Sequence, residues 1–457
     1  MKLFCVALLV FISITLKRFI CLLLIINFVF LIAGSSRFIY AGEEDPADDL
    51  LINAQTYNPR FFQSKVHIHD PRFLEHEQLL DFGARDILQE KGLTLDLVYI
   101  SDFVTNHSGG LKREGSGIDT SISYLSNTDL TVELDTEKAG FWKGGIFHLH
   151  SFNHHGANPS EDYIGDLQVA DNFESEKGTK LYEFWYQHTF DLYGTDLSLL
   201  AGQHDLNSEF NVTEYGLLFL HSSFGFNNEI SNNIPVSNFP IAALGFRVKW
   251  EPTENVYFMA EISDGDPGRN DCGKHWKLDS KEGFLNFFEL GYHFGDQEES
   301  RTMPGAYKFG WWYHTDEFDD VRDTDENDDL REHDDNYGLY FIADQMLLPG
   351  EGDTGLGAFF QIGGVPDDRT EVDFYVGGGI HYKGIIPNRE EDILGLAVAH
   401  AQISEDQRDA EDVAESDGLS FHRRDSHETA VELTYRTQVF SWLAIQPGVQ
   451  TIFNPGA

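Results

Sequence analysis

Hydrophobic and polar residues alternate through much of the chain, and the pattern is clearest near its end. Two runs, residues 427–437 and 443–453, place residues such as Leu433 on one parity and residues such as Glu432 on the other. Because strand side chains point alternately to two faces, each run predicts a strand with one apolar and one polar face. Pro447 is an exception, since proline cannot donate to a strand ladder. A hairpin of a soluble sandwich and a hairpin of a membrane barrel both fit this pattern.

The same alternation recurs from residue 93 onward and indicates about 15 strands. Short turns alternate with long polar connections, as in a membrane barrel with short turns at one rim and long loops at the other. A soluble sandwich predicts more uniform loops. The expected strands lie near residues 93–103, 129–135, 144–153, 180–190, 195–203, 241–250, 255–263, 283–293, 305–314, 336–344, 355–363, 371–381, 392–401, 427–437 and 443–453.

We therefore predict an all-β fold, a transmembrane antiparallel β-barrel preceded by a short helix. Single-chain bacterial barrels have even strand numbers. About 15 expected strands, and a sequence that ends at the turn residues NPGA, lead us to expect a 16-stranded barrel whose last strand is missing from this chain.

The region before the strands divides into three segments. Residues 1–41 contain two apolar runs separated by Lys17 and Arg18, and we predict a cleaved signal peptide, with a true membrane helix as the alternative. Residues 42–77 are expected to be a flexible polar lead-in. Residues 78–91 have apolar residues at helical spacing and predict a short amphipathic helix. Residues 92–457 then form the predicted β-barrel.

Composition excludes some functions. The formal net charge is −44, which argues against nucleic-acid binding because that requires clustered Lys and Arg. Much of the acid lies in two stretches, residues 317–335 and 404–417, which we interpret as solvated loops. A calcium loop starting at Asp323 is the alternative, but Asp328 replaces the required glycine. No hydrolase or metal motif is found, so we expect no enzyme activity, no cofactor and no metal site.

The strand expected at residues 180–190 carries the clearest candidate for substrate contact. Its central even-numbered residues are aromatic, and we expect them to face lipid as part of an aromatic girdle: Tyr182, Phe184 and Tyr186. Its odd parity predicts pore-lining residues: Glu183, Trp185 and Gln187. An indole can stack on a sugar ring while neighbouring polar groups bind its hydroxyls. The alternative is that Trp185 only fills space.

Two other strands offer polar faces. Glu133 and Asp135 lie on the polar side of the strand near residues 129–135 and are further candidate pore-lining residues. His148 and His150 share one face of the next strand. Two histidines do not make a zinc site, which needs three or four ligands, so we interpret them as polar lining of the pore.

Several stretches resemble the carbohydrate-selective porin family known as OprB. They run in the family's order from about residue 80 to the end: ARDILQEKGLTLDLVYISDFVTNHSGGLKREG, VELDTEKAGFWKGGIFHLH, YIGDLQVADN, LYEFWYQHTF, LSLLAGQHDLNSEF, AEISDGDPG and VELTYRTQVFSWLAIQPGVQTIFNPG. The resemblance implies a 16-stranded outer-membrane barrel that passes sugars by diffusion. It also implies that Arg113, a basic residue in the first of these stretches, helps to line the constriction.

The chain departs from the family's pattern at two places. Family members continue past the NPG turn into a final strand that ends in an aromatic residue, whereas this sequence stops at Ala457. The family also often has a basic residue where this chain has Gln203 and His204. The first departure concerns assembly of the barrel, and the second concerns the chemistry of the pore.

Three functions remain in competition. The first is a porin in the outer membrane of a Gram-negative bacterium that lets carbohydrates diffuse, with preference, into the periplasm. The second is a general porin with cation preference and no sugar site, and the third is a secreted soluble glycan-binding β-protein. The expected partners are mono- and oligosaccharides, outer-membrane lipid and the barrel-assembly machinery; whether the chain forms a homo-oligomer stays open.

Overall fold

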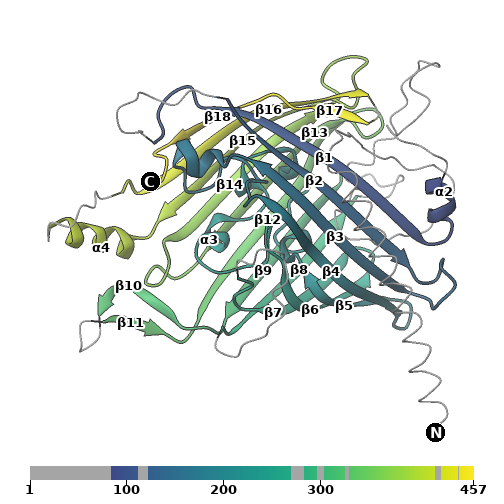
Figure 1. Cartoon of the computed structure of the whole chain (residues 1–457), viewed down its shortest axis with the longest axis horizontal. Helices are drawn as coiled ribbons and strands as arrows, with labels where there is room; N and C mark the ends of the chain where they lie inside the picture. Colours follow the sequence, from purple (N-terminus) through teal and green to yellow (C-terminus); the bar gives the residue numbers. More distant parts are fainter. Residues whose placement is uncertain are drawn as a thin grey trace, which may run out of the picture. The chain divides into compact units, whose positions relative to one another are not determined.

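One long antiparallel sheet dominates the structure (Figure 1). This computed structural model describes residues 84–111, 122–268, 282–295, 303–324, 329–416, 424–440 and 442–457. The sheet consists of β1 Leu93–Thr105, β2 Ile122–Asp135, β3 Gly145–Gly156, β4 Gly178–Asp191, β5 Asp196–His204, β6 Ala243–Thr253, β7 Val256–Asp264, β8 Phe284–Phe294, β9 Gly305–His314, β12 Asn336–Pro349, β13 Gly355–Gly364, β14 Val372–Lys383, β15 Ile393–Ile403, β16 His427–Phe440, β17 Leu443–Ile445 and β18 Gly448–Phe453. Each of the expected strands is present in this set.

The order of the strands in the sheet follows their order in the sequence. Every strand from β1 to β9 pairs with the next, β9 pairs with β12, and pairing then continues to β16. The last expected strand is divided into β17 and β18, which both pair with β16, because Pro447 separates them. Within the described residues, no pairing joins β18 to β1, so the ladder stays open between them. The fold is the antiparallel β-sheet architecture that the sequence predicted.

Alternation along the strands places apolar residues on the outer face. In β9 the odd-numbered aromatic residues are each about two-fifths exposed: Tyr307, Phe309, Trp311 and Tyr313. Their even-numbered neighbours, such as Lys308 and Trp312, are buried on the other face. Exposed aromatic surface of this kind is unfavourable in water and favourable against lipid. This pattern therefore supports a membrane barrel over a soluble sandwich.

The α-helices in the described part of the chain are short. They are α2 Ala84–Gln89, α3 Asn228–Ser231 and α4 Glu405–Ser416, and α2 lies inside the segment predicted to be helical. None of the helices in the described residues is long and apolar enough to cross a membrane. Residues 1–83, which include the expected signal peptide and lead-in, lie outside the described part of the chain.

The two acidic stretches contain secondary structure that we did not predict. Residues 317–335 include a separate hairpin, β10 Phe318–Thr324 and β11 Leu330–His333, and residues 404–417 include α4. Both lie in long connections of the sheet, where β10 packs beside α4 (Figure 1). Arg322 of β10 forms ion pairs with two acids of α4 at 2.8 and 3.0 Å. The interpretation as loops was wrong, because the two stretches contain a hairpin and a helix. The expected solvation agrees with exposed residues such as Asp319 and Glu332.

A long segment between β5 and β6 lies against the inner face of the sheet. It contains three 3-10 turns and α3. Its aromatic residues pack with strand residues such as Trp312 and Tyr375 in the two largest hydrophobic clusters. Carboxylates on distant strands accept hydrogen bonds from its backbone N–H groups. Glu289 of β8 accepts from Asn211 at 3.1 Å, and Glu432 of β16 accepts from His221 at 3.0 Å. These contacts hold the segment, residues 205–242, inside the curve of the sheet.

Candidate functional site

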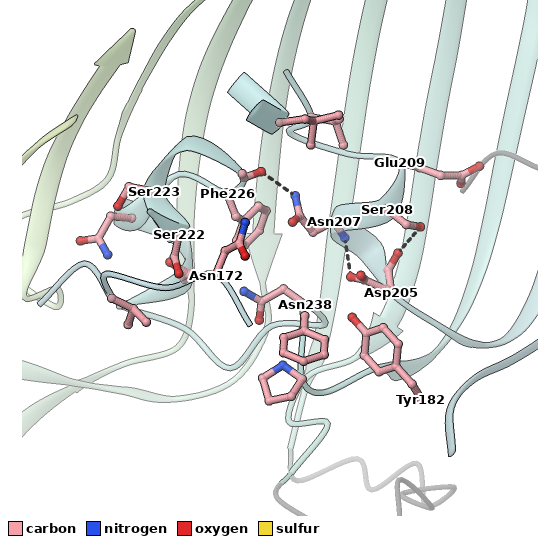
Figure 2. Close-up of a pocket in the computed structure, with 18 of the residues that line it drawn as sticks. Asn172, Tyr182, Asp205, Asn207, Ser208, Glu209, Ser222, Ser223, Phe226 and Asn238 are labelled. Carbon is pink, nitrogen blue, oxygen red and sulfur yellow. Dashed lines mark hydrogen bonds between the residues drawn. The ribbon is translucent and has the colours of Figure 1, made fainter. Parts of the chain in front are cut away.

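A cavity of about 770 Å³ lies between the inner segments and the wall of the sheet. Its walls come from strands β2 to β4 and β6 to β9 and from two connections, β3 to β4 and β5 to β6. Figure 2 shows several of its polar residues, including Asp205, Asn207 and Asn238, gathered around the space next to Tyr182. The cavity therefore offers many hydrogen-bonding groups beside a few aromatic rings.

Glu183 of β4 is the centre of a buried polar network. Its carboxylate lies 3.7 Å from a ring nitrogen of His148 and 3.5 Å from a ring nitrogen of His150. It also accepts hydrogen bonds from the indole N–H of Trp185 at 3.2 Å and from the backbone N–H of Asp205 at 3.1 Å. Glu183 is 2% exposed. Glu183, His148 and His150 all line the cavity, and their role as lining of the pore stays a prediction.

Two further carboxylates complete the network from β2. Glu133 lies 3.0 Å from the Nδ1 atom of His148, and Asp129 lies 2.9 Å from the Nε2 atom of His150. Glu133, one of the sequence candidates, thus contacts a lining residue although it does not line the cavity itself. Because the carboxylates alternate with imidazoles across three strands, the network fixes the orientation of Glu183.

Tyr182 was predicted to face lipid, and that prediction was wrong. The pairing of β3 with β4 shifts register between His150 and Ser151, which leaves Tyr182 as an extra residue. Tyr182 is 4% exposed and lines the cavity beside Glu183. The side-chain amide of Gln203 donates to the carbonyl oxygens of Leu181 and Tyr182, at 3.0 and 2.7 Å, and so stabilises the bulge. A bulge turns a side chain to the other face, and periodicity alone cannot detect it.

Trp185 is packed inside the wall. Its indole is 4% exposed and is stacked on the imidazole of His148, with ring centroids 4.5 Å apart and planes inclined by 5°. It is absent from the cavity lining. One indole face is thus covered by a protein ring, and Trp185 contacts the site through His148 and Glu183. Its direct stacking on a sugar stays a prediction.

Gln187 belongs to a second buried cluster, around Arg247 of β6. The Arg247 guanidinium donates to both carboxylate oxygens of Glu209 at 2.6 and 2.7 Å, to the side chain of Gln187 at 2.7 Å, and to the hydroxyl of Ser198 at 2.7 Å. Arg247 is 0% exposed. Glu209 lines the cavity, so this cluster sets the position of the inner segment at one side of the cavity.

Asp135, another sequence candidate, does not line the cavity. The carboxylate of Asp135 accepts from the backbone N–H groups of Glu137 and Lys138 at 2.9 and 3.1 Å, and so stabilises the turn after β2. Arg113 lies outside the described residues.

Burial changes the acidity of the carboxyls on the inner connections. Burial is the main cause that raises the pKa of Asp205 to about 7, and the charge of Glu183 adds to it. Burial likewise raises the pKa of Glu174, in the connection from β3 to β4, to about 7. Both residues line the cavity. Because these groups are partly protonated near neutral pH, the cavity is less negative than its number of acids indicates.

Cations also lie at the cavity. Lys249 of β6 and Lys308 of β9 are among its lining residues, and the ammonium group of Lys308 donates to the carbonyl oxygen of Val212 at 2.7 Å. The positive charges of these lysines therefore offset part of the negative charge of the acidic lining residues. Such a surface, with many donors and acceptors and a limited net charge, is suited to a neutral polyhydroxylated solute.

The inner segment at residues 205–242 supplies many of the cavity-lining residues, and sequence reasoning missed it. One signal was available: the connection is far longer than the usual loop and contains many apolar residues. Connections of this length are usually functional, and apolar residues in them require a buried surface.

Comparisons with known proteins agree with this architecture. The model of the OprB family, carbohydrate-selective porins, matches residues 119–457. The chain is 25% identical over 403 residues to Porin B of Pseudomonas aeruginosa, an alignment that covers 82% of this chain and 86% of that protein. It is similar to the high-pH structure of Pseudomonas putida OprB, with a TM-score of 0.74 and 23% identity over 82% of this chain and 92% of that one. The low-pH structure of the same protein gives a TM-score of 0.52 at 20% identity, with the same coverage.

Proposed function

The chain belongs to the carbohydrate-selective porin (OprB) family, and from this premise we propose that the cavity beside Glu183 is the sugar-preferring part of its diffusion path. The proposed location is the outer membrane of a Gram-negative bacterium, and the proposed solutes are neutral mono- and oligosaccharides. The chain acts as a channel, and we propose that it has no enzymatic activity.

The composition of the cavity carries this proposal. A sugar has hydroxyls around its edge and an apolar C–H face, so a site that prefers sugars needs polar groups beside an aromatic surface. Glu183, Asn207 and Asn238 supply acceptors and donors, and Phe239 is a half-buried ring in the same lining. Phe239 packs edge-on against Tyr182, with centroids 5.7 Å apart. We assign Phe239, rather than the covered Trp185, to the apolar face of the sugar.

Binding at this site must be weak, because a diffusing solute has to leave again. A net hydrogen bond contributes about 0.5–1.5 kcal/mol, and one to a charged group about 1.5–3 kcal/mol. Burying about 50 Å² of apolar sugar surface on Phe239 adds ~1.3 kcal/mol. After the cost of immobilising the sugar, we expect dissociation constants near the millimolar scale, about −4 kcal/mol.

Glucose block of the ion current in planar bilayers tests this assignment. Phe239→Ala is expected to weaken the block about tenfold, the equivalent of ~1.4 kcal/mol. Glu183→Gln keeps the shape and one acceptor, and is expected to weaken the block and to reduce cation preference. Glu137→Gln, an exposed acid in the turn after β2, removes the same charge away from the cavity and is expected to change neither.

Two outcomes would count against the proposal. If glucose and longer oligosaccharides fail to block the wild-type current, the chain is a general porin without a sugar site. If block occurs but neither Phe239→Ala nor Glu183→Gln weakens it, the sugar binds elsewhere in the channel.

A further inference from the structure

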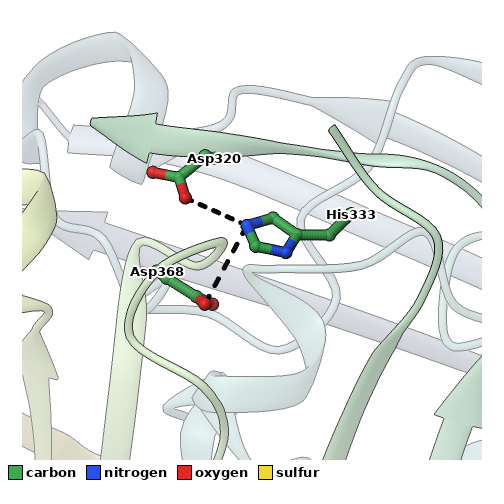
Figure 3. Close-up of side chains that lie close together, drawn as sticks. All are labelled: Asp320, His333 and Asp368. Carbon is green, nitrogen blue, oxygen red and sulfur yellow. Dashed lines mark hydrogen bonds and ion pairs between the residues drawn. The ribbon is translucent and has the colours of Figure 1, made fainter. Parts of the chain in front are cut away.

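We propose that Asp320, His333 and Asp368 form a binding site for a zinc-like divalent cation in the long connections of the sheet (Figure 3). One possible ligand atom from each residue lies within 4.8 Å of the other two. The group lies apart from the cavity at Glu183, since none of its members lines that cavity. The proposal is therefore independent of the proposed sugar path.

The three residues come from separate segments that meet at this point. Asp320 lies in β10, His333 ends β11, and Asp368 belongs to the connection between β13 and β14. The backbone N–H of Val321 donates to the carbonyl oxygen of Asp368 at 2.8 Å, which joins the hairpin to that connection. Segments fixed in this way present their side chains without a large rearrangement, as a metal site requires.

The Asp320 carboxylate is already oriented toward the site. Its Oδ1 atom accepts from the backbone N–H groups of Arg322 and Asp323, at 2.9 and 2.7 Å. Its Oδ2 atom lies 3.0 Å from the Nε2 atom of His333. Asp320 is 3% exposed. Since Oδ1 is used by the backbone, Oδ2 is the oxygen directed at a metal.

The distances are close to those of a zinc site. Ligands at about 2.0–2.2 Å from a tetrahedral ion lie ~3.4 Å from one another. The Nε2 atom of His333 lies 3.0 Å from Asp320 Oδ2 and 3.9 Å from Asp368 Oδ2. Shifts of about half an ångström in the two His333 contacts would thus bring them to the spacing of zinc ligands. Three protein ligands leave the fourth position for water.

The ligand types favour zinc over calcium. Calcium takes six to eight oxygen ligands, whereas one imidazole and two carboxylates form the mixed nitrogen and oxygen set that zinc accepts. Asp368 is 35% exposed and His333 is 11% exposed at their side chains, so an ion can reach the site from solvent. The arrangement differs from the calcium loop considered from the sequence, because it joins distant segments.

Arg369 contacts the site through Asp368. Its guanidinium donates to both oxygens of Asp368, at 2.8 and 3.1 Å, and to the carboxylate of Asp335 at 2.9 Å. These contacts fix the orientation of the Asp368 carboxylate and leave each of its oxygens a further lone pair for a metal. They also reduce the local negative charge, so a micromolar rather than nanomolar affinity is expected.

The competing explanation is an ion pair between protonated His333 and the two acids, with no metal. The two explanations predict different responses to zinc, because a bound ion links the β10–β11 hairpin to the connection after β13. Zinc should then raise the unfolding temperature and slow proteolysis of the hairpin. An ion pair alone predicts no dependence on zinc.

Isothermal titration of the full folded chain in detergent, with ZnCl₂ as the probe, tests the proposal. The chain has 19 histidines, so the comparison of variants decides the result. We expect one saturable micromolar site. His333→Ala should weaken zinc affinity at that site at least ~100-fold and Asp368→Asn at least ~10-fold, because loss of a residue that only supports a ligand already costs about 10–100-fold. His155→Ala, which removes an exposed histidine at the end of β3, should leave that site unchanged.

The unfolding temperature provides a second measurement on the same proteins. Zinc should raise it in the wild type and in His155→Ala, and not in His333→Ala. The proposal is overturned if wild type and His333→Ala bind zinc equally, or if no saturable binding occurs. If His333→Ala does not fold, Asp368→Asn decides between the two explanations by the same criteria.

Discussion

Removal of the Arg247 side chain should release the inner segment from the sheet wall. The guanidinium is fully buried, and its partner Glu209 is 4% exposed at the side chain. In Arg247→Met the Glu209 carboxylate stays buried without its bidentate partner, and Gln187 and Ser198 lose donors as well. Breaking one side of a buried ion pair costs ~3–5 kcal/mol. We therefore expect Arg247→Met to lower the free energy of unfolding by about that amount.

The double variant Arg247→Met with Glu209→Leu distinguishes the interaction between these two side chains from the contacts that each makes with other residues. Replacing both buried charges by apolar groups is often neutral or stabilising, so the double variant should be more stable than Arg247→Met alone. Urea unfolding of the chain in lipid vesicles, followed by tryptophan fluorescence, gives the four free energies of the cycle. Because Glu209 lines the cavity, the single-channel conductance of Arg247→Met should also change.

Two results would refute this reasoning. One is a cost below about 1 kcal/mol for Arg247→Met, which would mean that water reaches the pair and screens it. The other is additivity of the two substitutions, because independent sites show no coupling energy. In either case Arg247 does not position the inner segment.

Two further predictions follow from the same inner packing. Burial raises the pKa of Glu174 to about 7, so the contribution of Glu174 to stability is complete below about pH 4.5 and is lost as pH rises through 7. The urea midpoint of the wild type should therefore rise between pH 8 and pH 5, and Glu174→Gln should flatten that rise. An unchanged pH profile in the variant would contradict this. A Cβ on Gly363 would lie 1.6 Å from Glu229 Oε1, whereas a Cβ on Gly364 would meet only an oxygen at 3.6 Å. Gly363→Ala should therefore lower the urea midpoint and Gly364→Ala should not, and equal midpoints for the two variants would be the contrary result.

The strands could be predicted because a half-buried strand imposes a period of two on its sequence. In β9 the outer aromatic residues and the inner residues differ at every step, and β16 shows the same contrast between Leu433 and Glu432. Lipid on one side and packed protein on the other impose this contrast. The signal therefore located each expected strand without any tertiary information.

The site could be predicted only in part, because tertiary contacts decide it. Parity put Glu183, His148 and His150 on the polar faces of their strands, and all three line the cavity. The bulge at Tyr182, by contrast, depends on pairing with β3. Trp185 is on the predicted face, yet whether it meets solute or protein depends on His148. Periodicity gives the direction of a side chain and not its neighbours.

The structural role of the buried carboxylates could not be predicted from the sequence either, because it also depends on tertiary contacts. Glu428, Glu432 and Glu289 accept hydrogen bonds from backbone N–H groups of the inner connections. A buried N–H group without a partner is costly, so these carboxylates satisfy loops from distant parts of the sequence. Partners that are far apart along the chain leave no local pattern.

The most direct test of the account is the rate at which the folded chain admits sugars into liposomes. Swelling rates should be compared for glucose and for an uncharged non-sugar solute of similar size, in wild type and in Phe239→Ala. A sugar-preferring path predicts that glucose enters several-fold faster than the other solute, and that Phe239→Ala reduces this ratio. Equal rates for the two solutes in the wild type would contradict the account and identify a channel that selects by size alone.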